Sequence, residues 1–103
     1  MAANDSASTA ASTVNDGSTS GDTYYLLSEL IIQLCNRSAC LYKMEMYAEA
    51  KEDAAESVKL MSTIDDLRMR LQHPKALFRL ARAQLALEEY GDAIETVDRA
   101  LTA

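Results

Sequence analysis

Three basic side chains in the second half of the chain have a spacing that can bind carboxylates. Lys75 and Arg79 are four residues apart, and Arg82 follows three residues later. In a helix, such steps place side chains on one face. Charge-assisted hydrogen bonds from these groups to a carboxylate contribute roughly 1.5–3 kcal/mol each. The row therefore predicts a surface for an acidic ligand, and the alternative interpretation is a solvated helix face.

The surroundings of this row strengthen the first interpretation. No acidic residue lies between Leu67 and Leu87, although the whole chain carries a net charge of −6. Asn36, on an earlier segment, is a further candidate because its amide can donate to a carboxylate or to a peptide backbone. The alternative is that Asn36 packs as a polar residue against a neighbouring helix.

The elements that would position these side chains are helical, because apolar residues recur at three- and four-residue steps. We expect helices over 23–44, 48–60, 74–87 and from 91 to the end. Pro74 suits the first turn of the third helix, where its missing N–H costs nothing. Residues 62–73 leave two alternatives: the second helix continues to about Leu71, which we favour, or a short separate helix begins near Thr63.

The chain also contains an internal repeat at a constant offset of 43 residues, which relates 34–60 to 77–103. Tyr47 corresponds to Tyr90, and Ala50 corresponds to Ala93. Small residues along the second helix of each unit let a neighbouring helix approach closely. Such a repeat indicates stacked helical hairpins that bind other chains.

Composition excludes several classes of protein. The first 22 residues are rich in Ser, Thr and Ala, and we expect them to form a disordered tail. They lack the basic start and apolar run of a secretory signal, and no apolar run is long enough for a membrane span. The acidic total argues against nucleic acid or anionic membrane as a partner. Cys35 and Cys40 are predicted to be free thiols in a reducing compartment, so we expect a cytoplasmic protein. No metal cluster, cofactor motif or catalytic constellation is found, and we expect no enzyme activity.

The repeated pattern resembles the tetratricopeptide repeat family over roughly residues 24–103. Ser38, Tyr47, Ala50 and Ser57 match its small, aromatic and small positions in one unit, and the second unit has Ala81, Tyr90, Ala93 and Ala100. The resemblance implies an all-α domain over 23–103, with about two repeats of a right-handed superhelix. The repeats would cover about 31–64 and 74–103. Because the family unit has 34 residues, we place an insertion at about 65–73.

Within that family, Asn36, Lys75 and Arg79 resemble positions of the carboxylate clamp of co-chaperone modules. The resemblance implies an adaptor that binds the acidic C-terminal peptide of a heat-shock chaperone, with Arg82 adding positive field. Three of the five clamp positions are present. The lysine and asparagine that a preceding repeat would supply have no counterpart in the Ser/Thr-rich tail.

Two other functions stay open. The chain can be a structural helical module that packs against another protein or against itself, with an incidental basic row. It can also be part of a larger protein of the peptidyl-prolyl isomerase type, to which resembling modules are fused. Ile94, Val97 and Leu101 on the last helix are expected to remain partly uncovered. A fragment of a longer product, self-association and ordering by a partner would each explain that exposure, and we favour a fragment.

Overall fold

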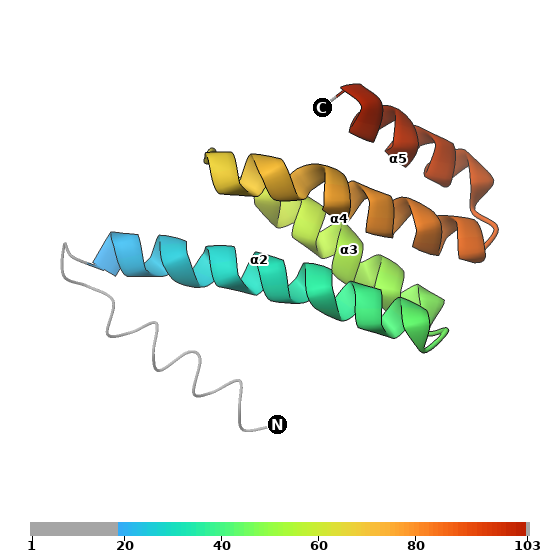
Figure 1. Cartoon of the computed structure of the whole chain (residues 1–103), viewed down its shortest axis with the longest axis horizontal. Helices are drawn as coiled ribbons and strands as arrows, with labels where there is room; N and C mark the ends of the chain where they lie inside the picture. The colour runs from blue at the N-terminus through green and yellow to red at the C-terminus, as the bar shows by residue number, and fades with distance from the viewer. Residues whose placement is uncertain (1–18, 103) are drawn as a thin grey trace.

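The computed structural model describes residues 19–102, which form four α-helices (Figure 1). They are α2 (Thr19–Lys43), α3 (Tyr47–Met61), α4 (Leu67–Ala86) and α5 (Tyr90–Thr102). Each helix packs against the next one along the chain, and α2 also contacts α4. The described part of the chain is thus all-helical, as the periodicity predicts, and consists of two hairpins, α2–α3 and α4–α5.

The turns of the two hairpins have the same backbone geometry. Glu45 and Glu88 occupy equivalent positions, and both have left-handed backbone, with φ of 61° and 63°. In the first turn the Met46 N–H donates to the Leu41 carbonyl at 2.9 Å, and the corresponding bond of the second turn is 2.8 Å. This is the Schellman arrangement, which satisfies the last carbonyls of a helix. The 43-residue repeat in the sequence is therefore also a repeat of the turn structure.

The first helix begins four residues earlier than predicted. It includes residues 19–22, which the composition assigns to the tail, and the expectation for 1–18 lies outside the described residues. Asp22 lies in the first turn of α2. A carboxylate is favourable there because the N-terminal end of a helix carries partial positive charge.

Neither alternative for residues 62–73 was right. Helix α3 ends at Met61, where the hydroxyls of Ser62 and Thr63 donate to carbonyls of the last turn at 2.6 and 2.7 Å. Asp66 then caps α4, because its side chain accepts from the Met69 N–H at 3.1 Å. The expected insertion at 65–73 thus consists of the end of a loop and the first turns of α4.

The predicted position of Pro74 was also wrong. It lies inside α4 rather than in a first turn, seven residues after the helix begins at Leu67. Proline has no N–H for the carbonyl of Arg70, so one bond of the helical ladder is missing. The Asp66 cap determines the start of α4 in spite of this cost.

The hydrophobic core lies between α2, α3 and α4. It contains Ile31 and Cys35 from α2, Ala54, Val58 and Met61 from α3, Ile64 from the loop, and Met69, Ala76, Leu77 and Leu80 from α4. Helix α5 buries only Ala93 and Thr96 among its described residues. The second hairpin is therefore covered on one side only.

Candidate functional site

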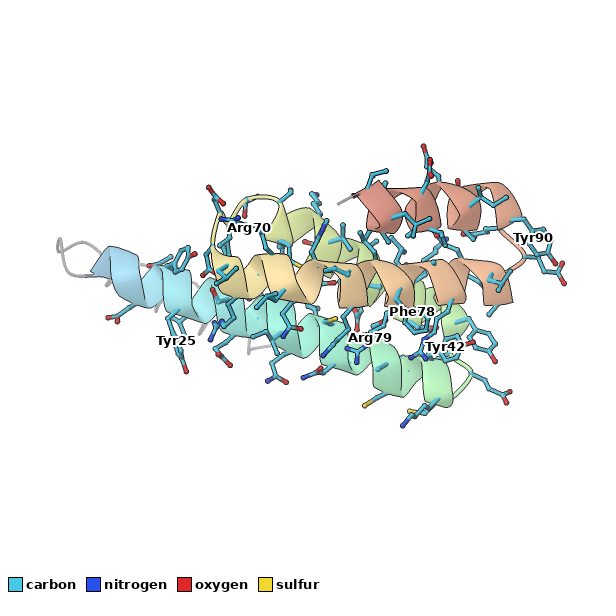
Figure 2. The ribbon with its side chains drawn as sticks, turned by 45° about the horizontal axis from the view of Figure 1, so that its top comes forward. Tyr25, Tyr42, Arg70, Phe78, Arg79 and Tyr90 are labelled. Carbon is cyan, nitrogen blue, oxygen red and sulfur yellow. The ribbon has the colours of Figure 1, made fainter. Side chains whose placement is uncertain are left out.

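The side chain of Arg79 joins α4 to α2. Its Nη1 donates to the Cys35 carbonyl at 2.9 Å and lies 3.2 Å from the Cys35 sulfur. The same nitrogen is 3.4 Å from Oδ1 of Asn36. Figure 2 shows Arg79 between the two helices. Two residues that the sequence singles out, 43 positions apart, thus meet at the seam between α2 and α4.

Lys75 lies one turn before Arg79 on α4 and is exposed. The four-residue step places it on the same side of the helix as Arg79. No carboxylate of residues 19–102 comes within 4 Å of its ammonium group. Lys75 is therefore available for a ligand that lies along this side of α4.

Arg82 makes aromatic contacts that its spacing alone does not predict. Its guanidinium carbon stacks over the Tyr42 ring, 4.0 Å from the centroid, and lies 5.5 Å from the centroid of Phe78. A cation over an aromatic face is attracted by the ring quadrupole. Its Nε is buried without a hydrogen-bond partner among the described residues. Arg82 thus packs α4 against the end of α2, and its charge partly faces aromatic rings.

The basic residues of α4 divide into two groups. Arg68 lies 3.9 Å from Glu29, and Arg70 lies 3.2 Å from Asp65. Within the described range, Lys75, Arg79 and Arg82 have no such carboxylate neighbour. The unpaired positive charge of α4 is therefore concentrated between Lys75 and Arg82.

Sequence reasoning missed the polar contacts that hold the hairpins together. Arg37 donates to both carboxylate oxygens of Asp53, at 2.6 and 3.0 Å, and the Asp53 carboxylate raises the pKa of Arg37. Lys51 forms an ion pair with Glu89 at 2.9 Å. No periodicity rule identifies these pairs, because their members belong to separate elements of the fold.

Ionisable groups at the other end of the molecule have shifted pKa values. The Tyr24 hydroxyl donates to Asp66 at 2.6 Å, which raises the pKa of Tyr24 and lowers that of Asp66. Burial, followed by the charge of Arg99, lowers the pKa of His73. These groups lie away from the Asn36–Arg79 contact, so we assign them to stability rather than to ligand binding.

A concave surface lies beside the predicted site. It is a groove of about 580 Å³ between α4 and α5, and its lining is mostly apolar. Tyr90 lines this groove and is 57% exposed, whereas Tyr47 packs edge-on against Tyr42 with a centroid distance of 5.2 Å. The two tyrosines, predicted to fill equivalent turns, therefore differ because α4 covers this side of the first hairpin, whereas no described helix covers the corresponding side of the second.

Three further observations concern metal ligands, membrane spans and similarity to known proteins. Among residues 19–102, no three His, Cys, Asp or Glu side chains are grouped so that they could hold a metal ion. No described helix is long and apolar enough to cross a membrane. Comparison with protein-family models, with curated proteins and with solved structures finds no match for this chain.

Proposed function

We propose that this chain is a protein-interaction adaptor that binds an acidic, carboxylate-terminated peptide along the α2–α4 seam. Lys75 and Arg79 would hold carboxylate oxygens, and the Asn36 amide would orient the peptide. The tetratricopeptide resemblance makes the C-terminus of a heat-shock chaperone the preferred partner. The observation that carries the proposal is the contact of Arg79 with Asn36, next to Lys75, where neither cation has a carboxylate within 4 Å among residues 19–102.

The position of Arg79 supports this role. The Cys35 carbonyl holds one guanidinium nitrogen, so the side chain is oriented before a ligand arrives. Preorganised groups lose less conformational freedom on binding. The bonds to α2 use only Nη1, which leaves Nε and Nη2 for a carboxylate.

The expected affinity is low. Two charge-assisted contacts at roughly 1.5–3 kcal/mol each give about 3–6 kcal/mol before the cost of ordering the peptide. Micromolar binding requires about 8 kcal/mol. Contacts with exposed apolar groups such as Phe78, which is 60% exposed, must supply the difference. We therefore expect a dissociation constant weaker than micromolar for this chain alone.

The test is a fluorescence-anisotropy titration with a labelled peptide ending in Glu-Glu-Val-Asp. We expect Lys75→Glu to weaken binding by at least about tenfold, because it replaces an attractive contact by a repulsive one. Lys59→Glu is the matched control, since Lys59 is an exposed lysine of α3 away from the seam. Binding should also weaken with added salt. Equal affinity of the two variants, or undiminished binding of a C-terminally amidated peptide, would contradict the proposal.

A second function is favoured by a separate observation. The apolar groove between α4 and α5 is more typical of a surface that packs against another helix than of a solvent-facing surface. A structural or self-associating module would use this groove and would not need Lys75 or Arg79. Lys75 and Arg79 do not line the groove, so substitutions of these two residues test the first function without affecting the second.

A further inference from the structure

The second hairpin exposes the surface that corresponds to the covered surface of the first. In the first hairpin, Ala54 and Val58 are 0% and 4% exposed, because α4 packs over them. Their equivalents 43 residues later, Val97 and Leu101, are 46% and 79% exposed and line the groove between α4 and α5. Nothing in the described range covers this groove.

At two positions the exposed surface is more apolar than its covered counterpart, whereas Arg82 and Asp98 of the groove stand where the first hairpin has alanine. Phe78, which is 60% exposed, stands where the first hairpin has Cys35, and Leu101 stands where it has Val58. Adaptation to solvent would have produced polar replacements at these positions. Contiguous apolar side chains on a surface mark an interaction site.

The first hairpin shows what kind of element fits such a surface. Helix α4 covers it, and the residues of α2 are the equivalents of those in α4. Figure 1 shows α2 and α5 on opposite sides of α4, so the free face of α2 and the groove are at opposite ends of the row. The element that corresponds to α4 beyond the groove is therefore α2 of a second copy.

Two contacts between the hairpins have equivalents between copies in which both residues differ from those inside the chain. The internal interface contains the ion pair between Lys51 and Glu89. At the interface between copies, the equivalent pair would be Ile94 of one copy and Met46 of the next. Both are apolar, and they are 70% and 37% exposed. A charged pair inside the chain is thus replaced on both sides at once by an apolar pair.

A cation–aromatic contact inside the chain likewise has an apolar pair as its equivalent between copies. Arg82 stacks on Tyr42 inside the chain. The equivalents between copies would be Ala39 of one copy and Leu85 of the other, and Leu85 is 56% exposed.

Two other groups on the free face of α2 also fit this arrangement. Leu26, which is 65% exposed, corresponds to the core residue Met69, and the exposed Cys40 corresponds to Ala83. Arg37 stands where α4 has Leu80, and its charge is already paired with Asp53 of the same copy at 2.6 Å.

We propose that copies of this chain associate head to tail, with α2 of one copy seated in the α4–α5 groove of the next. The contact joins two different surfaces, so it does not close a two-fold dimer and can add further copies. This inference does not depend on the peptide-binding function, because neither Lys75 nor Arg79 takes part.

The test is sedimentation equilibrium over a range of protein concentrations, with circular dichroism to verify that each variant is folded. The wild-type mass should rise above the monomer value of 11.3 kDa as concentration increases. Ile94→Lys and Met46→Glu should each weaken the association about tenfold, because each places an unpaired charge in an apolar contact. The combination Ile94→Lys with Met46→Glu should restore most of the association, since it recreates the ion pair of the internal interface.

The matched control combines Ile94→Lys with Met46→Lys, which brings two like charges together and should remain monomeric. A wild-type chain that is monomeric at every concentration would overturn the proposal. Association that both single substitutions leave unchanged would overturn it too. If the double variant with opposite charges associates no more strongly than the like-charged control, the assigned contact would also be contradicted.

Discussion

Replacing the glutamate in each turn by glycine should stabilise the protein. Glu45 and Glu88 have φ of 61° and 63°, in the left-handed region where a side chain clashes with the following carbonyl. This conformation costs a residue with a side chain roughly 1–2 kcal/mol. Glycine avoids that cost but loses more backbone freedom on folding, which returns roughly 0.5–1 kcal/mol. The net gain from backbone conformation is therefore about 0.5–1 kcal/mol per turn, by the difference between these two terms.

Charge adds to this gain. Each glutamate lies directly after the C-terminal end of a helix, which carries partial negative charge, and the unfavourable contact costs about 0.3–1 kcal/mol at low salt. Each Glu→Gly change should therefore raise the free energy of unfolding by about 1 kcal/mol, which corresponds to roughly 4–8 °C in Tm for a domain of this size. The backbone bonds of the two turns share no partner, so the gains should add in the double variant.

The assay is thermal unfolding followed by far-ultraviolet circular dichroism at one fixed protein concentration, since association would add stability of its own. Glu45→Ala removes the charge but keeps the backbone cost, so it separates the two contributions. Glu56→Gly is the matched control, because Glu56 is an exposed residue in the interior of α3. There glycine should lower stability by about 1 kcal/mol. If Glu45→Gly and Glu88→Gly lower Tm as Glu56→Gly does, the argument from left-handed backbone is refuted.

Two further predictions concern the α4 helix. Pro74→Ala should raise the free energy of unfolding by about 1–3 kcal/mol, measured by urea denaturation, because alanine restores the bond to the Arg70 carbonyl; an unchanged midpoint would contradict this. His73→Gln should remove a pH dependence of stability that begins near pH 6.5. Burial and Arg99 lower the pKa of His73 in the folded protein, so the unfolded state takes up the proton first and stability falls with pH from the ordinary value of 6.5 down to the lowered one. The measurement is the urea midpoint of both proteins across this pH range. An equal slope of midpoint against pH in wild type and variant would contradict the prediction.

The fold could be predicted where one kind of signal acts alone. The apolar periodicity of α2 and the repeated turns at Glu45 and Glu88 identify the two hairpins within a few residues. The prediction was wrong around Pro74 because two signals for the start of a helix compete there. Proline predicts a helix start at its own position, but the carboxylate of Asp66 satisfies the Met69 N–H and begins the helix earlier. Sequence rules do not say which of two such helix starts gives the structure of lower free energy.

The candidate site could be predicted only in part, for a related reason. The repeat offset makes Asn36 and Arg79 equivalent positions of neighbouring hairpins, and the structure places them 3.4 Å apart. The main acceptor of Arg79 is a backbone carbonyl, which no side-chain motif reveals. The stacking of Arg82 on Tyr42 likewise depends on the separation of α2 and α4. Steps of four and three residues therefore yield one exposed, one bridging and one aromatic-stacked cation.

The two proposals have one geometric consequence in common. The clamp that this chain resembles is spread over the first helices of three consecutive repeats. This chain supplies two such helices, α2 and α4. Head-to-tail association would place α2 of a second copy beside α4, because it would occupy the position that α4 holds beside α2. The row of first helices would then be continuous across the copies, and a peptide could contact cations from both. Repeat modules gain such extended surfaces by adding units in one direction. An adaptor with a weak site in each copy could thereby obtain useful affinity from many weak contacts, which is the usual effect of multivalency.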